Sequence, residues 1–152
     1  MKKLSKLLII TIFGLLFFGL AYAQFAKPED AIKYRQSVMN IIGYHMGQMG
    51  AVVMGKKPYE KQEFSHHTTI EEMLSTLPWE AFMTAGTDKG KTAFKSSAFS
   101  EKDKFMAKAK TFETETQKLV KAAAGDDFNA IKAQYGEVGK SCKSCHEDYR
   151  SR

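Results

Sequence analysis

Two cysteines and a histidine near the carboxyl end form a compact group of reactive side chains in this sequence. Cys142, Cys145 and His146 give the pattern C-x-x-C-H, the attachment signal for a c-type haem. Thiols three positions apart lie on one side of a helix, where each can form a thioether to a vinyl group of one porphyrin. The imidazole of His146 can then bind the iron. The pattern therefore predicts one covalently bound haem c with His146 as an axial ligand.

Other uses of a C-x-x-C pair fit the rest of the chain less well. A structural zinc site needs more cysteine or histidine ligands at matching spacing, and there is no third cysteine. A thioredoxin-like dithiol belongs early in a βαβ pattern, whereas this one closes a helical sequence. A disulfide would leave His146 without a role. With both thiols used by haem, no Cys–His nucleophile remains, and we expect no enzyme activity.

Residues 1–23 have the composition of a secretory signal peptide. Lys2, Lys3 and Lys6 form a positive region, residues 7–20 are apolar, and an A-x-A cleavage site ends at Ala23. The apolar run is short for a membrane span, although an uncleaved anchor is the alternative. Cleavage would leave residues 24–152 as one haem domain in the periplasm, the kind of compartment in which bacteria attach c-type haem.

The charge of the chain points to no nucleic acid or membrane partner after cleavage. The whole sequence has a net charge of +6, and removal of the leader would leave 20 basic and 17 acidic residues, a net charge of +3. A mildly basic surface of mixed sign is what solubility alone requires.

Four stretches with the three-and-four spacing of bundle helices follow the leader. Together they predict an all-α fold, an antiparallel up-and-down four-helix bundle that holds its cofactor among inward side chains. Pro28 begins the first helix, and residues 55–58 end it. The second covers residues 59–82, with a break at Pro78. A Ser100–Asp103 capping pair begins the third, Gly125 ends it, and Asp126 or Asp127 caps the fourth.

The spacing also predicts which side chains face inward on each helix. On the first these are Ile32, Arg35, Met39, Ile42, Met46, Met49 and Val53, and on the second His66, Ile70, Met73 and Leu77. On the third they are Phe105, Ala109, Phe112, Thr116, Leu119 and Ala123. On the fourth they are Phe128, Ile131, Tyr135, Val138, Cys142, Cys145 and Tyr149. Both cysteines therefore lie on a buried seam, and the haem is expected inside the bundle.

Four blocks of this sequence resemble cytochrome c′. They are KPEDAIKYRQ at 27–36, LPWEAF at 77–82, GTD at 86–88 and VGKSCKSCHEDYR at 138–150, in order and at similar spacing. The resemblance implies a periplasmic haem c protein, often a homodimer, in which His146 is the only strong axial ligand. It also implies that the other face of the iron is open, lies under apolar side chains, and binds NO and CO.

The resemblance assigns further residues to the surroundings of the haem. Arg35 and Gln36 lie beside the haem and its propionates, Met39, Trp79 and Phe82 in the distal pocket, and Arg150 on the proximal side. Independently, Arg35 is an inward arginine among apolar positions, for which a propionate is a suitable partner. The alternative is an arginine that extends its head to solvent at the end of the bundle. The loop at 83–97 departs from the family pattern, so it carries no assignment.

These residues support two functions of different class. The leading one is capture of NO on a five-coordinate haem, with a role in protection or buffering. The alternative is a low-spin electron carrier, with an unknown redox partner, in which Met39 is the sixth ligand. A haem peroxidase would need a distal acid–base pair that the pocket lacks.

The remaining histidines and the small residues of the first helix lie outside the predicted haem site. His45 is expected on the surface or at an interface, and His66 with His67 could form a metal patch. Small residues on the first helix would let the corresponding helix of a second copy approach closely; they are Gly43, Gly47, Gly50 and Ala51.

Overall fold

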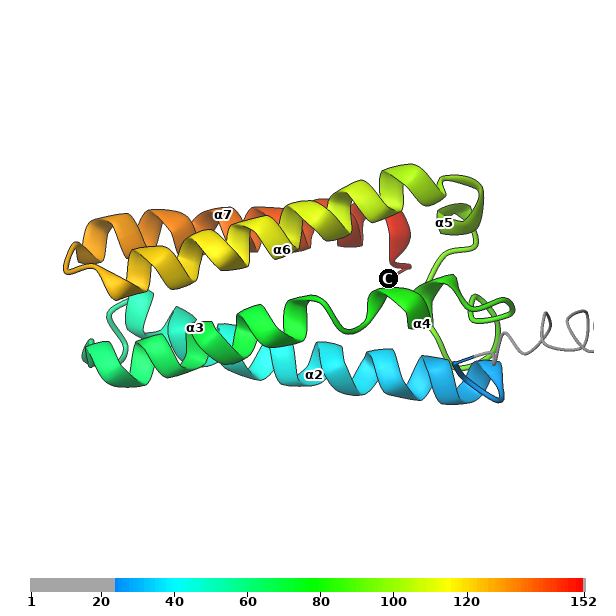
Figure 1. Cartoon of the computed structure of the whole chain (residues 1–152), viewed down its shortest axis with the longest axis horizontal. Helices are drawn as coiled ribbons and strands as arrows, with labels where there is room; N and C mark the ends of the chain where they lie inside the picture. Colours follow the sequence, from blue (N-terminus) through cyan, green and yellow to red (C-terminus); the bar gives the residue numbers. More distant parts are fainter. Residues whose placement is uncertain (1–23, 152) are drawn as a thin grey trace, which may run out of the picture.

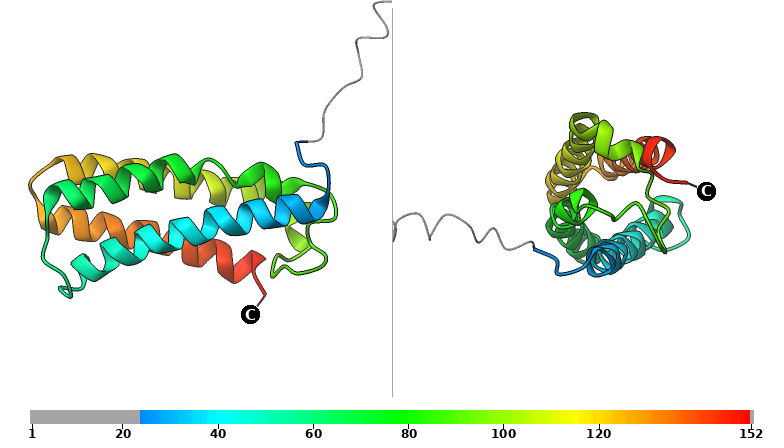
Figure 2. Two further views of the ribbon diagram at one scale, coloured as in Figure 1. Left: turned by 90° about the horizontal axis from the view of Figure 1, so that it is seen from below. Right: turned by 90° about the vertical axis from the view of Figure 1, so that its right-hand side faces the viewer.

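The computed structural model describes residues 24–151, which form a bundle of helices (Figure 1). One layer contains α2 (Pro28–Val53) and α3 (Lys61–Ser75), and the other contains α6 (Lys102–Ala124) and α7 (Phe128–Tyr149). Consecutive long helices run in opposite directions, as the side and end views in Figure 2 show. The predicted antiparallel four-helix bundle is therefore confirmed. The predicted signal peptide, residues 1–23, lies outside the described residues.

Most of the predicted helix boundaries match the structure. Pro28 opens α2, where its missing N–H costs no hydrogen bond. Gly55 follows α2 with φ 71°, a backbone conformation that favours glycine. The carboxylate of Asp127 caps α7 by accepting from the backbone N–H groups of Asn129 (2.9 Å) and Ala130 (3.2 Å).

The predicted capping pair before the third helix is wrong. Helix α6 begins at Lys102 without a side-chain cap, and a short helix, α5 (Ser97–Ser100), precedes it. The hydroxyl of Ser100 donates to the carbonyl of Ser97 instead (2.9 Å). Ser100 is the last residue of α5, so Glu101 rather than Ser100 takes the N-cap position of α6.

The break at Pro78 divides the second predicted helix into two segments. Helix α3 ends at Ser75, and α4 (Trp79–Met83) begins directly after the proline. The indole N–H of Trp79 donates to the carbonyl of Ser75 across the break (2.7 Å). This bond satisfies a carbonyl at the end of α3 and fixes the indole against the bundle core.

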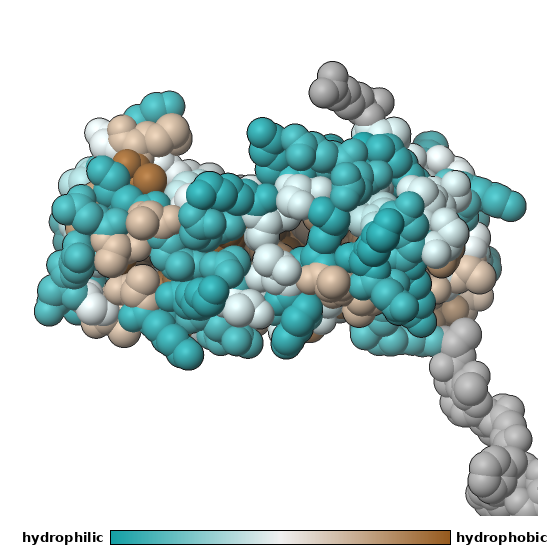
Figure 3. All heavy atoms as spheres, turned by 90° about the horizontal axis from the view of Figure 1, so that it is seen from above, coloured by the Kyte–Doolittle hydropathy of each residue, from teal (hydrophilic) through white to brown (hydrophobic). Residues whose placement is uncertain are grey.

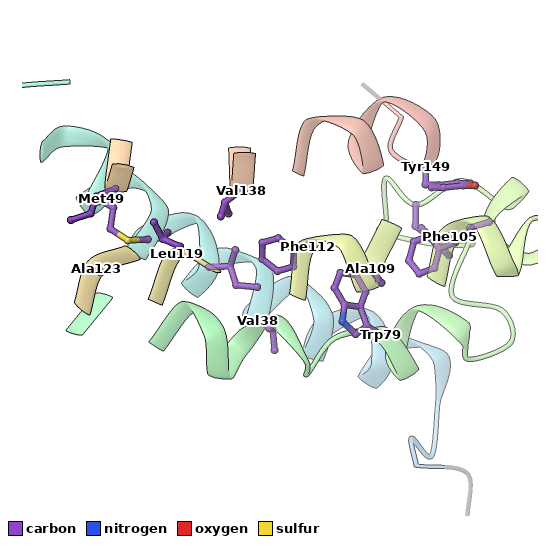
Figure 4. Packing of buried hydrophobic residues seen from close by; sticks show 14 of the residues in the cluster. Val38, Met49, Trp79, Phe105, Ala109, Phe112, Leu119, Ala123, Val138 and Tyr149 are labelled. Carbon is purple, nitrogen blue, oxygen red and sulfur yellow. The ribbon is translucent and has the colours of Figure 1, made fainter. Parts of the chain in front are cut away.

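The core runs along the bundle from Met49 and Ala123 at one end to Phe105 and Tyr149 at the other (Figure 4). All six inward positions predicted on α6 are buried. On α7 the predicted positions are buried or half-buried, with both cysteines among the half-buried ones. On α2 the predicted positions are likewise buried or half-buried, and Val38 and His45 are buried in addition.

The inward face predicted for α3 is wrong. Its buried side chains are Phe64, Thr68, Glu71 and Ser75. Met73 and the following Leu77 are instead exposed. The apolar residues of α3 repeat on one side of the helix, but its buried side is mostly polar, so apolar spacing does not mark the core face here.

The outer face over α6 and α7 is mainly hydrophilic, with hydrophobic residues visible between the hydrophilic ones (Figure 3). Within residues 24–151, no helix is both long enough and apolar enough to cross a membrane.

Candidate functional site: an apolar cavity beside the C-x-x-C-H segment

A cavity of about 540 Å³ opens between α2, α4, α6 and α7. All nine residues predicted for the haem site line it, although they come from three separate parts of the sequence. They are Arg35, Gln36, Met39, Trp79, Phe82, Cys142, Cys145, His146 and Arg150. Most of the remaining lining is apolar, so the site can hold a large apolar group with a few polar contacts at its edge.

The two cysteines project from one side of α7 into this cavity. Both are free thiols and half-buried. Burial raises the pKa of Cys142 to about 11, with a further contribution from the charge of Glu71. Burial also raises the pKa of Cys145. The thiols are therefore protonated at neutral pH, unlike the thiolates of metal sites and cysteine nucleophiles.

His146 lies one position after the second thiol, at the edge of the same cavity. Partial burial lowers its pKa, and the nearby positive charge of Arg150 lowers it further. The imidazole is therefore mainly neutral near pH 7, the form that has a lone pair for a metal. Two thiols, a neutral imidazole and an apolar cavity together fit a haem bound through Cys142, Cys145 and His146.

Arg35 lines the cavity from α2 and is only 2% exposed. Its guanidinium donates to the backbone carbonyls of Thr87 (2.6 Å) and Ala81 (3.3 Å) and to the hydroxyl of Thr92 (2.8 Å). Burial lowers its pKa to about 10, and the charge of Asp88 opposes that shift. The alternative of an arginine reaching out to solvent is therefore excluded.

Two aromatic rings enclose this guanidinium. The Arg35 Cζ atom lies 4.6 Å from the ring centre of Phe82 and 4.7 Å from that of Phe94. Because the cation is largely desolvated, both contacts are stronger than they would be on a surface. Arg35 thus connects α2, α4 and the loop after α4 at the mouth of the cavity.

The wall that faces the cysteines consists of Met39 and the aromatic residues of α4. Met39 is half-buried on α2. The rings of Trp79 and Phe82 are stacked with centres 6.0 Å apart, and Trp79 meets Phe112 edge-on at 6.2 Å. Gln36 is exposed at the rim, where its amide donates to the carbonyl of Lys91 (2.9 Å).

Several residues of the lining were not among the predicted site residues. Phe105, Phe112 and Tyr149 were predicted as core, and their positions on the inward faces of α6 and α7 could have marked them. Thr92 and Phe94 come from the loop between α4 and α5, which has no periodicity to locate it. Backbone hydrogen bonds to the end of α7 hold this loop, from Lys95 N–H to Tyr149 carbonyl (3.0 Å) and from Ser151 N–H to Ala93 carbonyl (2.8 Å).

The histidines on α2 and α3 lie apart from this cavity. His45 is buried rather than on the surface, and its Nδ1 is 2.7 Å from the Nδ1 of His67, so one ring donates to the other. Burial lowers the pKa of both rings. His66 is exposed. Across residues 24–151 no three His, Cys, Asp or Glu side chains are placed to hold a metal ion together, so a metal patch at His66 and His67 has no third ligand.

Comparisons with known proteins agree on one family. The model of the family described as Cytochrome C′ matches residues 30–150. The solved structure of cytochrome c prime from Shewanella frigidimarina is 39% identical, with a TM-score of 0.82 over 85% of this chain and 100% of that one.

Two further structures, both of cytochrome c prime from Alcaligenes xylosoxidans, contain a diatomic gas. They are the nitric oxide complex of a mutant and the carbon monoxide complex of a variant. Each is 39% identical with a TM-score of 0.79 over 85% of this chain, and 99% and 100% of those chains are covered.

Proposed function

This chain belongs to the cytochrome c′ family, and on that premise we propose that it captures nitric oxide in the apolar cavity, in a role of protection or buffering. The observation that carries the proposal is the convergence of all nine predicted site residues on that cavity. Support for the ligand comes from the nitric oxide and carbon monoxide complexes of the Alcaligenes protein. Carbon monoxide is therefore proposed as a second ligand.

The cofactor of the family is haem c. We assign its two thioethers to Cys142 and Cys145 and its axial ligand to His146, because these side chains lie together at the cavity. The bound haem supplies an iron that can change its charge by one electron and take a small diatomic ligand. Helix α7 holds the three attachment side chains within one turn and a half, so they are oriented before the cofactor arrives.

The opposite wall determines which ligands can enter. Met39, Trp79 and Phe82 offer apolar surface, and burying a charged or strongly hydrated ligand against it without partners is costly. The cation at the mouth, Arg35, already donates to two backbone carbonyls and a hydroxyl. Lys108, on the α6 side, donates to Ser144 and pairs with Asp148. A small uncharged diatomic molecule therefore meets the least resistance.

The direct test is to add nitric oxide to the reduced, haem-loaded protein without oxygen and to record its absorption spectrum. We expect a change in the haem bands at about one equivalent. In Met39→Ala, which makes room in the wall, binding should be faster than in Met39→Leu, which preserves its volume. A haem-loaded protein whose absorption spectrum does not change when nitric oxide is added would contradict the proposal.

The second candidate is a six-coordinate electron carrier. It rests on Met39, which lines the same cavity as His146 and has a thioether that can bind iron. This function predicts a low-spin ferric spectrum with a sulfur-to-iron band, and loss of both features in Met39→Leu. If the wild-type protein is high-spin and Met39→Leu leaves the spectrum unchanged, Met39 is not an iron ligand.

We further propose that the mature protein is residues 24–152, exported to the periplasm after removal of the leader. The intact mass of the purified protein tests this proposal, because it identifies the first residue as Gln24 or an earlier one.

A homodimer is proposed as the assembly. Ile41 (46% exposed) and Tyr44 (60% exposed) offer apolar surface on α2 to a second copy. Two of the small residues expected at such an interface have other roles, since Gly43 lines the cavity and Gly50 packs under Tyr135. Sedimentation of wild type and Tyr44→Glu tests the dimer, which the substitution should weaken.

A further inference from the structure

Glu71 is a buried carboxyl group without a hydrogen-bond partner. It lies one turn before the end of α3 with 0% of its surface exposed, and neither carboxylate oxygen has a partner among the described residues. The polar neighbours on the same buried face do not donate hydrogen bonds to Glu71. Thr68 donates to the carbonyl of Ser65, and Ser75 donates to the carbonyl of Glu72. Burial without a partner disfavours an ionised carboxylate strongly, so the group favours its protonated form.

The surroundings of Glu71 contain no opposing charge that would hold it ionised. Burial raises its pKa to about 8, and no charged group of α2, α3 or α6 within residues 24–151 contributes to the shift. The titratable groups that respond to its charge are the phenol of Tyr135 and the thiol of Cys142, both on α7. The causes of the pKa shifts of His45 on α2 and His67 on α3 do not include the charge of Glu71.

This carboxyl group is close enough to the cavity to sense a charge there. Cys142 lines the cavity, and the charge of Glu71 is among the causes that raise the pKa of its thiol. One turn after Glu71, the carbonyl of Ser75 accepts from the indole of Trp79, which also lines the cavity. Glu71 itself is not part of the lining, so its influence there acts through the low-dielectric interior rather than by contact.

We propose that Glu71 is a proton-binding site coupled to the oxidation state of the haem iron. When one electron from a one-electron donor enters the iron, one proton from solvent binds a Glu71 oxygen; oxidation releases both. The electron and the proton cancel in charge, so the interior keeps the same net charge through the cycle. The inference rests on the proposed attachment of haem at Cys142.

The physical reason is that the iron and the carboxylate have opposite charges. A ferric iron carries one more positive charge than a ferrous one and therefore stabilises a carboxylate in the same interior. Reduction removes that attraction and raises the affinity of Glu71 for a proton. Linkage then requires the converse, so the reduced state becomes less favourable as pH rises through the range in which Glu71 titrates.

The test is a spectroscopic redox titration of the haem-loaded protein at a series of pH values on both sides of pH 8. We expect the midpoint potential of wild type to fall as pH rises through this range, and Glu71→Gln to lose that part of the dependence. Glu72→Gln is the matched control, because it removes the neighbouring carboxylate of α3 and should behave like wild type. A pH dependence that Glu71→Gln leaves unchanged would overturn the inference.

A second measurement identifies the group itself. The infrared difference spectrum between reduced and oxidised protein should contain a carboxylic acid C=O band that is present in wild type and Glu72→Gln and absent in Glu71→Gln. The same band in all three proteins would assign the proton to another group and overturn the inference. A purified chain without covalent haem, recognised by its absorption spectrum, would instead contradict the proposed function.

Discussion

Arg35 shows how one residue can serve both the fold and the site. Its three hydrogen bonds end on residues 81–92, and its guanidinium lies against two aromatic rings of the cavity mouth. The charge that would attract a propionate is therefore already fixed in place by backbone carbonyls. Such a pre-oriented cation loses little freedom when a ligand binds it.

Replacing Arg35 with methionine tests this anchoring role. The apolar stem remains, but buried carbonyls of Ala81 and Thr87 lose their donor, so we expect a loss of about 3 kcal/mol in the free energy of unfolding. Denaturant unfolding measures it. Lys33→Met is the control, since Lys33 is exposed on the same helix, and it should stay within about 0.5 kcal/mol of wild type. Equal stability of the two variants would show that Arg35 does not anchor the loop.

Among the helices, α2 and α7 approach each other closely at Gly50. The phenol of Tyr135 on α7 donates to the carbonyl of Met46 (3.0 Å), and its oxygen would lie only 2.6 Å from a side-chain carbon added at Gly50. Glycine at this position lets the two helices meet.

Two glycine substitutions on α2 distinguish the effect of the close contact with Tyr135 from the effect of helix propensity on stability. Gly50→Ala should lower the free energy of unfolding by about 1–3 kcal/mol, because the tyrosine must move. Gly47→Ala meets nothing within 4 Å and should raise it by about 0.5–1 kcal/mol. Thermal unfolding distinguishes the two. Tyr135→Phe removes the obstructing oxygen, so the double variant with Gly50→Ala should lose less than the sum of the single changes.

The helices differed in how well their inward faces could be predicted. On α6, six apolar or small residues at steps of three and four coincide with the buried side. On α3 the buried side contains Thr68, Glu71 and Ser75, and apolar residues such as Met73 are exposed. The spacing of apolar residues identifies a core face only where that face is apolar. The buried face of α3 is mostly polar, so this spacing does not identify it.

At the scale of the whole molecule, Glu71 makes stability depend on pH. Its pKa is raised from 4.5 in the unfolded chain to about 8 in the folded one. The folded state therefore binds the Glu71 proton more tightly than the unfolded chain does. The contribution of this proton to the free energy of unfolding is complete below about pH 4.5 and is lost as pH rises toward pH 8.

The corresponding prediction compares unfolding free energies of wild type and Glu71→Gln across this range. Relative to the variant, wild type should lose up to about 1.4 kcal/mol per pH unit between these two pKa values. Denaturant titrations of the haem-loaded proteins at several pH values measure the difference. Parallel curves for the two proteins would mean that Glu71 is ionised in both states, and Glu72→Gln should follow wild type.

The family, the all-α bundle and the class of cofactor can all be predicted from the sequence, because each depends on local patterns. C-x-x-C-H is contiguous, and the inward faces of α6 and α7 repeat within a few residues. Three features depend on the tertiary structure. They are the loop carbonyls that accept from Arg35, the contact between Gly50 and Tyr135, and the burial of Glu71. These features join residues far apart in the chain, and burial of a carboxyl group depends on what the other helices place around it, which no local pattern encodes.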